Sequence, residues 1–241
     1  MVGLAPALAE ARPLRVFIDA GHGVTGNDGN HGAYCQLEKD HALSVALALA
    51  KALPALGAVE VKLSRQTDSG PSYAARIHDA EVWRADAIIS LHSDARGMSW
   101  PWSPFEGQSL VCQRNSLEPG FAVLWNDGGP KKINQARERL GRAVIEAMVS
   151  AGFTPYDGRN YGALYRPDLT EGGWVDIRPR GQDVYFLRGS ATVPTVIIET
   201  HHALDVDEVA RWQDPKTVQT FAEALWAGLQ TALNQDPDPG R

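Results

Sequence analysis

The sequence predicts a single α/β domain with a mostly parallel sheet of about six strands and helices on both faces. Segments typical of strands alternate with segments typical of helices along the chain, and several strand segments are continuously apolar. A strand that is apolar on both sides needs cover on both sides, which a parallel sheet between helices provides. The length of 241 residues suits one large domain.

The first half of the chain supplies three strand segments and two helices. The apolar run after Pro13 is typical of a buried strand that ends in a glycine turn. Apolar residues at three- and four-residue spacing then predict a helix that Asp40 caps and that Pro54 and Gly57 end. The elements expected next are a strand over 59–65, a helix over 72–84 and a strand over 86–92.

Two long loops separate the expected elements of the second half. The loop at 97–107 is rich in Trp, Pro and Ser. Residues 154–183 have no clear hydrophobic period and are expected to form a long surface loop with fragments of structure. Loops of this kind are more often functional than structural filler. The other expected elements are strands near 109–113, 184–189 and 194–200 and helices near 134–150 and 218–233.

Both ends of the chain differ from the domain expected over residues 13–233. Residues 1–12 are apolar with two A-x-A patterns, which favours the end of an export signal over a frayed terminus, although no positive run comes first. The tail, residues 234–241, is polar and expected to be disordered. Export implies a periplasmic or secreted protein, in which Cys35 and Cys112 could pair or remain two free thiols.

The composition argues against several classes of protein. The chain is 44% hydrophobic and 22% charged, as ordinary globular proteins are. Its formal net charge of −6 argues against a nucleic-acid partner, which requires a basic face. No apolar run reaches the roughly 18 residues of a membrane span. We expect a monomer.

Side chains typical of metal ligands follow three of the expected strands. His22 follows the first strand, His92 ends the third, and Glu199 ends the last core strand. Glu38, two residues before Asp40, is expected in the loop that returns from the first strand. Because the carboxyl ends of parallel strands meet at one edge, we expect these side chains to converge. Two imidazoles, a carboxylate and a spare carboxylate match one catalytic zinc ion with a general base beside it.

This set of groups favours amide hydrolysis. A catalytic zinc lowers the pKa of water from about 15.7 to about 7, and a glutamate can take the proton as the water attacks a carbonyl. The same acid then protonates the leaving amine. Taken singly, His22 could be a turn residue, His92 a hydrogen-bonded strand end and Glu38 a solvated charge, whereas a buried Glu199 needs a partner.

Two further residues are weaker candidates. Asp19 could accept a hydrogen bond from the ring of His22 and so fix its tautomer. His201 lies two residues after Glu199, so if the strand continues it points to the same side and could touch substrate or metal.

These motifs resemble the zinc-dependent N-acetylmuramoyl-L-alanine amidases of the type-3 catalytic domain, which cut bacterial peptidoglycan. The resemblance covers roughly residues 14–233. The matching segments are VFIDAGHG with His22, LEKDHAL with Glu38, VKLSRQTD, RIHDAEVWRADAIISLHSDA with His92, and VYFLRGSATVPTVIIET with Glu199. The resemblance implies one zinc ion held by the first two histidines and Glu38, with Glu199 as the catalytic base. The implied substrate bond joins the lactyl group of N-acetylmuramic acid to L-alanine.

Three short stretches depart from the family pattern. Asp-Ala-Gly-His replaces Asp-Pro-Gly-His, Ser93-Asp94 replaces Ala-Asn, and Thr200-His201-His202 follows the catalytic glutamate where the family usually has Gly-Phe. These changes leave the zinc and catalytic positions intact but alter the substrate groove. Two other functions therefore stay open: a zinc carboxypeptidase or other amidohydrolase, and a wall-binding or regulatory module without turnover.

Overall fold

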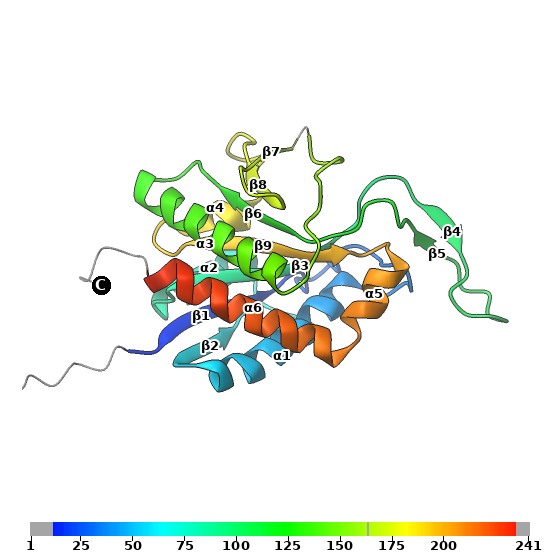
Figure 1. The fold of residues 1–241 in the computed structure, drawn as a ribbon, viewed down its shortest axis with the longest axis horizontal. Coiled ribbons are helices and arrows are strands. Elements are labelled where there is room, and N and C mark those ends of the chain that lie inside the picture. The colour runs from blue at the N-terminus through cyan, green and yellow to red at the C-terminus, as the bar shows by residue number, and fades with distance from the viewer. Residues whose placement is uncertain (1–11, 163, 235–241) are drawn as a thin grey trace, which may run out of the picture.

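A computed structural model describes residues 12–162 and 164–234 and has the layered α/β arrangement that the sequence predicts (Figure 1). The expected export signal at 1–12 and the tail at 234–241 lie outside the described residues, apart from Arg12 and Asn234. None of the described helices combines the length and the apolarity needed to cross a lipid bilayer.

The central sheet has seven strands within the described residues, one more than expected. They are β1 (Leu14–Ala20), β2 (Val59–Leu63), β3 (Ala87–Asp94), β6 (Ala122–Asn126), β7 (Tyr165–Pro167), β8 (Gly173–Asp176) and β9 (Thr195–His202). Their order is β2-β1-β3-β9-β6-β8-β7. β2, β1, β3 and β9 run parallel, and β6 runs antiparallel to β9. The sheet is thus mostly parallel, and the carboxyl ends of β1, β3 and β9 share one edge.

Helices cover both faces of this sheet. They are α1 (Glu38–Leu56), α2 (Tyr73–Val82), α3 (Lys131–Ser150), α4 (Tyr185–Gly189), α5 (Val206–Trp212) and α6 (Pro215–Asn234). Figure 1 shows α1, α3 and α6 on the near face and α2 and α4 behind. In β1, Val16 and Ile18 pack in the cluster of the near face, whereas Phe17 packs with α2 and α4. The continuous apolar run of β1 is therefore explained by burial on both sides.

The start of the first helix differs from the expectation. α1 begins at Glu38, and Leu37 precedes it without a side-chain capping bond. Asp40 lies in the first turn and not at the cap. There, its negative charge still interacts favourably with the positive end of the helix dipole. Pro54 lies inside the last turn. Glu38 is consequently held on a helix and not in a loop.

The second half of the chain contributes more strands than its sequence predicts. β6 was not expected, and the fragments of structure expected within the loop at 154–183 are β7 and β8. The expectation of a strand at 184–189 is wrong, because this segment forms α4 and buries Phe186 and Leu187. β7 and β8 are three and four residues long, which is too short to show a reliable period.

The segment at 97–114 forms a separate hairpin that projects from the sheet (Figure 1). β4 (Trp100–Trp102) pairs antiparallel with β5 (Cys112–Arg114). Cys112 forms a disulfide with Cys35, which answers the question that the sequence leaves open. Trp102 Nε1 also donates a hydrogen bond to Ala33 O at 2.6 Å. Both contacts hold the hairpin beside the loop that leads to Glu38.

Candidate metal centre and catalytic pocket

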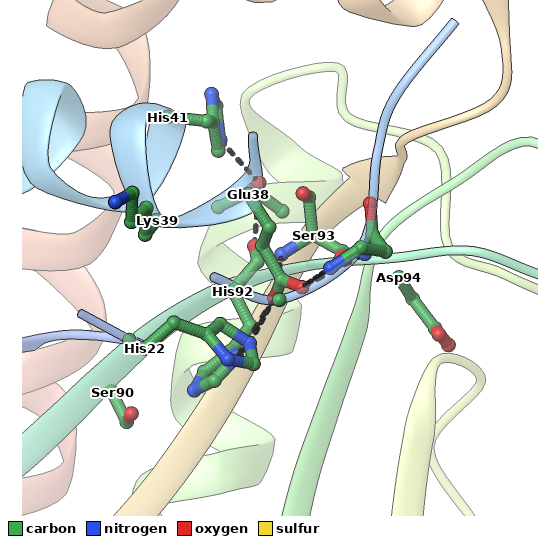
Figure 2. Close-up of polar contacts among 12 residues, drawn as sticks. His22, Glu38, Lys39, His41, Ser90, His92, Ser93 and Asp94 are labelled. Atoms are coloured by element: carbon green, nitrogen blue, oxygen red, sulfur yellow. Dashed lines mark hydrogen bonds and ion pairs between the residues drawn. The ribbon is translucent and has the colours of Figure 1, made fainter. Parts of the chain in front are cut away.

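His22, Glu38 and His92 converge at the sheet edge, as the sequence predicts (Figure 2). Glu38 Oε1 lies 2.9 Å from both His22 Nε2 and His92 Nδ1. The same two ring nitrogens are 3.1 Å apart. One donor atom from each residue lies within 4.8 Å of the others, a spacing that a single ion can bridge.

The turn after β1 explains why a histidine stands between two glycines. A Cβ atom on Gly21 would lie 2.5 Å from Leu91 O and 2.6 Å from the His92 ring, so only glycine fits against β3. His22 and Gly23 have φ angles of 59° and 74°, in the left-handed region. His22 adopts this uncommon backbone conformation at the position where its ring meets the cluster, which is typical of functional sites.

Asn27, and not Asp19, orients the His22 ring. Asn27 Oδ1 lies 2.7 Å from His22 Nδ1, which leaves Nε2 facing the cluster. Asp19 accepts hydrogen bonds from Arg76 Nη1 at 2.9 Å and Ser90 Oγ at 2.6 Å. The expected contact between Asp19 and His22 is therefore wrong: the Asp19 carboxylate is engaged by the buried arginine of α2. Nothing in the sequence singles out Asn27 among the polar residues of its loop.

Two buried arginines fix the backbone around His22. Arg65 donates hydrogen bonds to the carbonyls of Ala20 and Gly21, at 2.9 and 2.8 Å. Arg76 donates to the carbonyls of Ala20 and His22, at 3.0 and 2.7 Å. These bonds make the turn a rigid support for the first imidazole.

The Glu38 carboxylate is held in one orientation. Asn30 donates to Oε2 from its backbone N at 3.0 Å and from Nδ2 at 2.8 Å. The backbone N of Ser93 donates to Oε1 at 3.2 Å. Burial raises the pKa of Glu38, but hydrogen bonds to His22 and His92 outweigh burial, so its pKa lies well below the usual range. The carboxylate is ionised and faces both imidazoles.

Glu199 faces the same pocket from the neighbouring strand. It pairs in register with His92, and both residues line a cavity of about 230 Å³ together with His22 and Glu38. Glu199 Oε2 is buried without a hydrogen-bond partner among the described residues. Burial, followed by the charges of Asp94 and Glu38, raises the pKa of Glu199 well above its usual value. A carboxyl group with a raised pKa holds a proton more readily than an exposed glutamate does.

Asp94 also lines this cavity, which sequence reasoning did not foresee. It accepts hydrogen bonds from the Tyr161 hydroxyl and from Arg96 Nε, the latter at 3.1 Å. Arg96 is itself buried against the Tyr156 ring, with its guanidinium carbon 4.0 Å from the ring centre. The Ser93-Asp94 departure from the family pattern was the one signal in the sequence that pointed to this residue.

His201 does not reach the pocket, so the expectation that it touches substrate or metal is wrong. Between the pairs that β9 forms with His92 and Asp94, β9 contains one residue more than β3. This bulge changes the alternation of side chains after Glu199. The His201 ring is buried and stacks on Trp212, with ring centres 5.8 Å apart.

Comparison with known proteins supports the family resemblance. Residues 16–231 match the family model described as N-acetylmuramoyl-L-alanine amidase. The chain is 35% identical over 225 residues to N-acetylmuramoyl-L-alanine amidase AmiC of Escherichia coli, covering 91% of this chain and 52% of AmiC. It is 39% identical over 85 residues to N-acetylmuramoyl-L-alanine amidase CwlM of Bacillus licheniformis, covering 35% of this chain and 33% of CwlM. The chain therefore spans about half of AmiC and a third of CwlM.

Solved structures share the fold. An N-acetylmuramyl-L-alanine amidase, Ami1, from Mycobacterium smegmatis superposes with a TM-score of 0.70 at 20% identity, covering 94% of this chain and 99% of Ami1. An N-acetylmuramoyl-L-alanine amidase from Clostridium difficile 630 has a TM-score of 0.67 at 21% identity, covering 94% of this chain and all of that one. At such identities the likeness concerns the fold alone.

Proposed function

Because the chain belongs to the N-acetylmuramoyl-L-alanine amidase family, we propose that it hydrolyses the amide between the lactyl group of N-acetylmuramic acid and L-alanine of the stem peptide. The observation that carries this proposal is the convergence of His22, Glu38, His92 and Glu199 on one small cavity. The products would be a glycan strand and a free peptide.

His22, Glu38 and His92 fit a single zinc ion. Catalytic zinc sites use three protein ligands from imidazoles and carboxylates and leave one position open. Here the donors are His22 Nε2, His92 Nδ1 and a Glu38 carboxylate oxygen, and the cavity lies beside them. When bound, zinc supplies Lewis-acid polarisation of the scissile carbonyl.

Glu199 provides the proton transfers in this proposal. Oε2 has no competing partner among the described residues, so it is free to accept the proton of the attacking water. The raised pKa of Glu199 lets it keep that proton until the carbon–nitrogen bond breaks and then deliver it to the leaving nitrogen. Glu38 is unsuited to this role because both of its oxygens are engaged.

The proposed substrate also implies where the protein acts. Peptidoglycan lies outside the cytoplasm, so we infer a periplasmic or secreted protein. The disulfide between Cys35 and Cys112 supports this inference, since such bonds persist in oxidising compartments.

Product analysis tests the proposal. Zinc-loaded protein is incubated with purified peptidoglycan, and the released material is analysed by mass spectrometry. We expect whole stem peptides with a free L-alanine amino terminus. Stems shortened at the carboxyl end would instead indicate a carboxypeptidase, and binding to the wall without any release would indicate a module that lacks turnover.

A further inference from the structure

A second cavity, of about 450 Å³, has several arginines among its lining residues. Four arginines line it, and Asp183 is the one carboxylate among its lining residues. The arginines are Arg137, Arg178, Arg180 and Arg188. In a chain whose net charge is −6, this concentration of positive charge is a local exception.

Acidic side chains neutralise only part of this charge. Arg178 pairs with Asp176 at 2.8 Å, and Arg188 pairs with Asp183. Arg180 is exposed and makes no hydrogen bond or ion pair with any residue that the structure describes. The cavity therefore keeps an accessible guanidinium whose donors are free for an anion.

Arg137 is a buried cation without a carboxylate. Only 1% of its surface is exposed, and its Nη atoms donate to the backbone carbonyls of Asn126 and Ser190, at 3.2 and 2.7 Å. Its buried Nε has no partner in the described part of the chain. Burial and the nearby charge of Arg188 lower the pKa of Arg137 to about 10. A buried charge that lacks a counter-ion is costly, so an anion in this cavity would be stabilised.

The amino terminus of α3 adds further positive charge near the arginine cavity. Pro130 lines the cavity and precedes α3 without a side-chain cap, and the helix has 20 residues. The amino terminus of a helix carries a partial positive charge. A carboxylate in the cavity would meet this charge together with the arginines.

The arginine cavity adjoins the catalytic pocket. Tyr165 lines the pocket, and Arg178 lines the cavity and donates from Nη2 to the Tyr165 hydroxyl at 3.3 Å. Along β6, Ala122 pairs with Glu199, and Asn126 lines the cavity four residues further on. At about 3.3 Å per residue, that separation is roughly 13 Å.

We propose that the arginine cavity is a subsite for a carboxylate on the peptide part of the substrate, an inference that rests on the function proposed above. An extended peptide of about four residues spans the separation between the two cavities. Every peptide product of the reaction has a terminal carboxylate, and guanidinium groups bind carboxylates through two parallel hydrogen bonds. The subsite would thus set a preference for anionic stem peptides.

Kinetics with a matched pair of substrates test this subsite. One muramyl tetrapeptide has its carboxyl groups free, and the other has all of them amidated. We expect the free form to have a KM about five- to tenfold lower, since a typical net hydrogen bond contributes at this level. Arg180→Gln should raise the KM of the free form about fivefold and leave kcat and the amidated substrate unchanged. Arg159→Gln, at an exposed arginine that pairs with Asp157, is the control.

Calorimetry with the free tetrapeptide gives a second readout that does not need turnover. Binding that weakens in Arg180→Gln but not in Arg159→Gln supports the subsite even if the reaction proves different. Equal KM values for the two substrates in the unmodified protein would overturn it, as would equal peptide affinity in the Arg180 variant. Absence of hydrolysis of both substrates would instead reject the proposed function.

Discussion

Glu38 and Glu199 line one pocket, and the pKa values of their carboxyl groups are shifted in opposite directions. Glu38 lies at the amino terminus of a helix, and its contacts with the two imidazoles lower its pKa despite burial. Glu199 has no donor among the described residues for Oε2, so burial raises its pKa. Opposite shifts of two nearby carboxyl groups are a recurrent sign of an acid–base assignment.

Glu199→Gln is the sharpest change at the residue scale. Glutamine keeps the size of the side chain but cannot accept the proton of water, so turnover on peptidoglycan should fall by at least about a hundredfold. The zinc content, measured by atomic absorption, should stay at one ion per chain. Turnover close to that of the unmodified protein would remove Glu199 from its proposed role.

Gly21→Ala tests whether the close approach of the turn to β3 positions the metal ligands. The new methyl group would lie 2.5 Å from Leu91 O and 2.6 Å from the His92 ring, so one of them must move. We expect a loss of about 1–3 kcal/mol in unfolding free energy and weaker zinc affinity.

The matched control for this substitution is Gly162→Ala, where a Cβ atom would meet nothing within 4 Å. Chemical denaturation and a competitive zinc titration compare the two variants. If both bind zinc alike and unfold alike, the tight turn has no bearing on the site.

At the scale of elements, the sequence predicts the longer strands whose side chains are buried on both faces of the sheet. β1, β3 and β9 are continuous apolar runs that end in polar residues, and this alone places three of the four site residues at one edge. The bulge in β9 gave no such signal. Its extra residue follows the apolar run, so nothing in the sequence marks where the side chains of β9 switch to the other face of the sheet. His201 was misplaced for that reason.

The contact between α1 and β9 predicts sensitivity to acid. His41 on α1 lies edge-on to the His201 ring, with ring centres 4.6 Å apart. Burial lowers the pKa of His41 to about 4, against a smaller opposing effect of the Glu38 charge. The unfolded chain, with a histidine pKa near 6.5, then binds a proton before the folded chain does. The free energy of unfolding should therefore fall as the pH drops from about 6.5 to about 4.

Replacing His41 should make this dependence shallower. One such group contributes up to about 1.4 kcal/mol per pH unit within that window. Urea unfolding of metal-free protein at several pH values compares His41→Gln with His78→Gln, a substitution at an exposed histidine of α2. If the His41 variant keeps the full slope, its burial does not govern the acid response.

Over the whole molecule, β6 connects the two cavities, because Ala122 pairs with Glu199 and Asn126 lines the arginine cavity. The candidate metal ligands come from the carboxyl ends of β1 and β3 and from the start of α1, and the arginine cavity lies about four residues away along β6. The hairpin of β4 and β5 is tied to the loop that leads to Glu38 by the Cys35–Cys112 disulfide. The sequence predicted the layers and the four converging residues, whereas this second cavity depends on β6 and α4, which were missed or assigned wrongly.

The most direct test of the account is a crystal structure of zinc-loaded protein, with anomalous scattering measured at the zinc edge. The account predicts one strong peak about 2.0–2.2 Å from His22 Nε2, His92 Nδ1 and a Glu38 oxygen. Glu199 should face that peak without binding it. A peak elsewhere in the molecule, or none between the two imidazoles, would contradict the central claim.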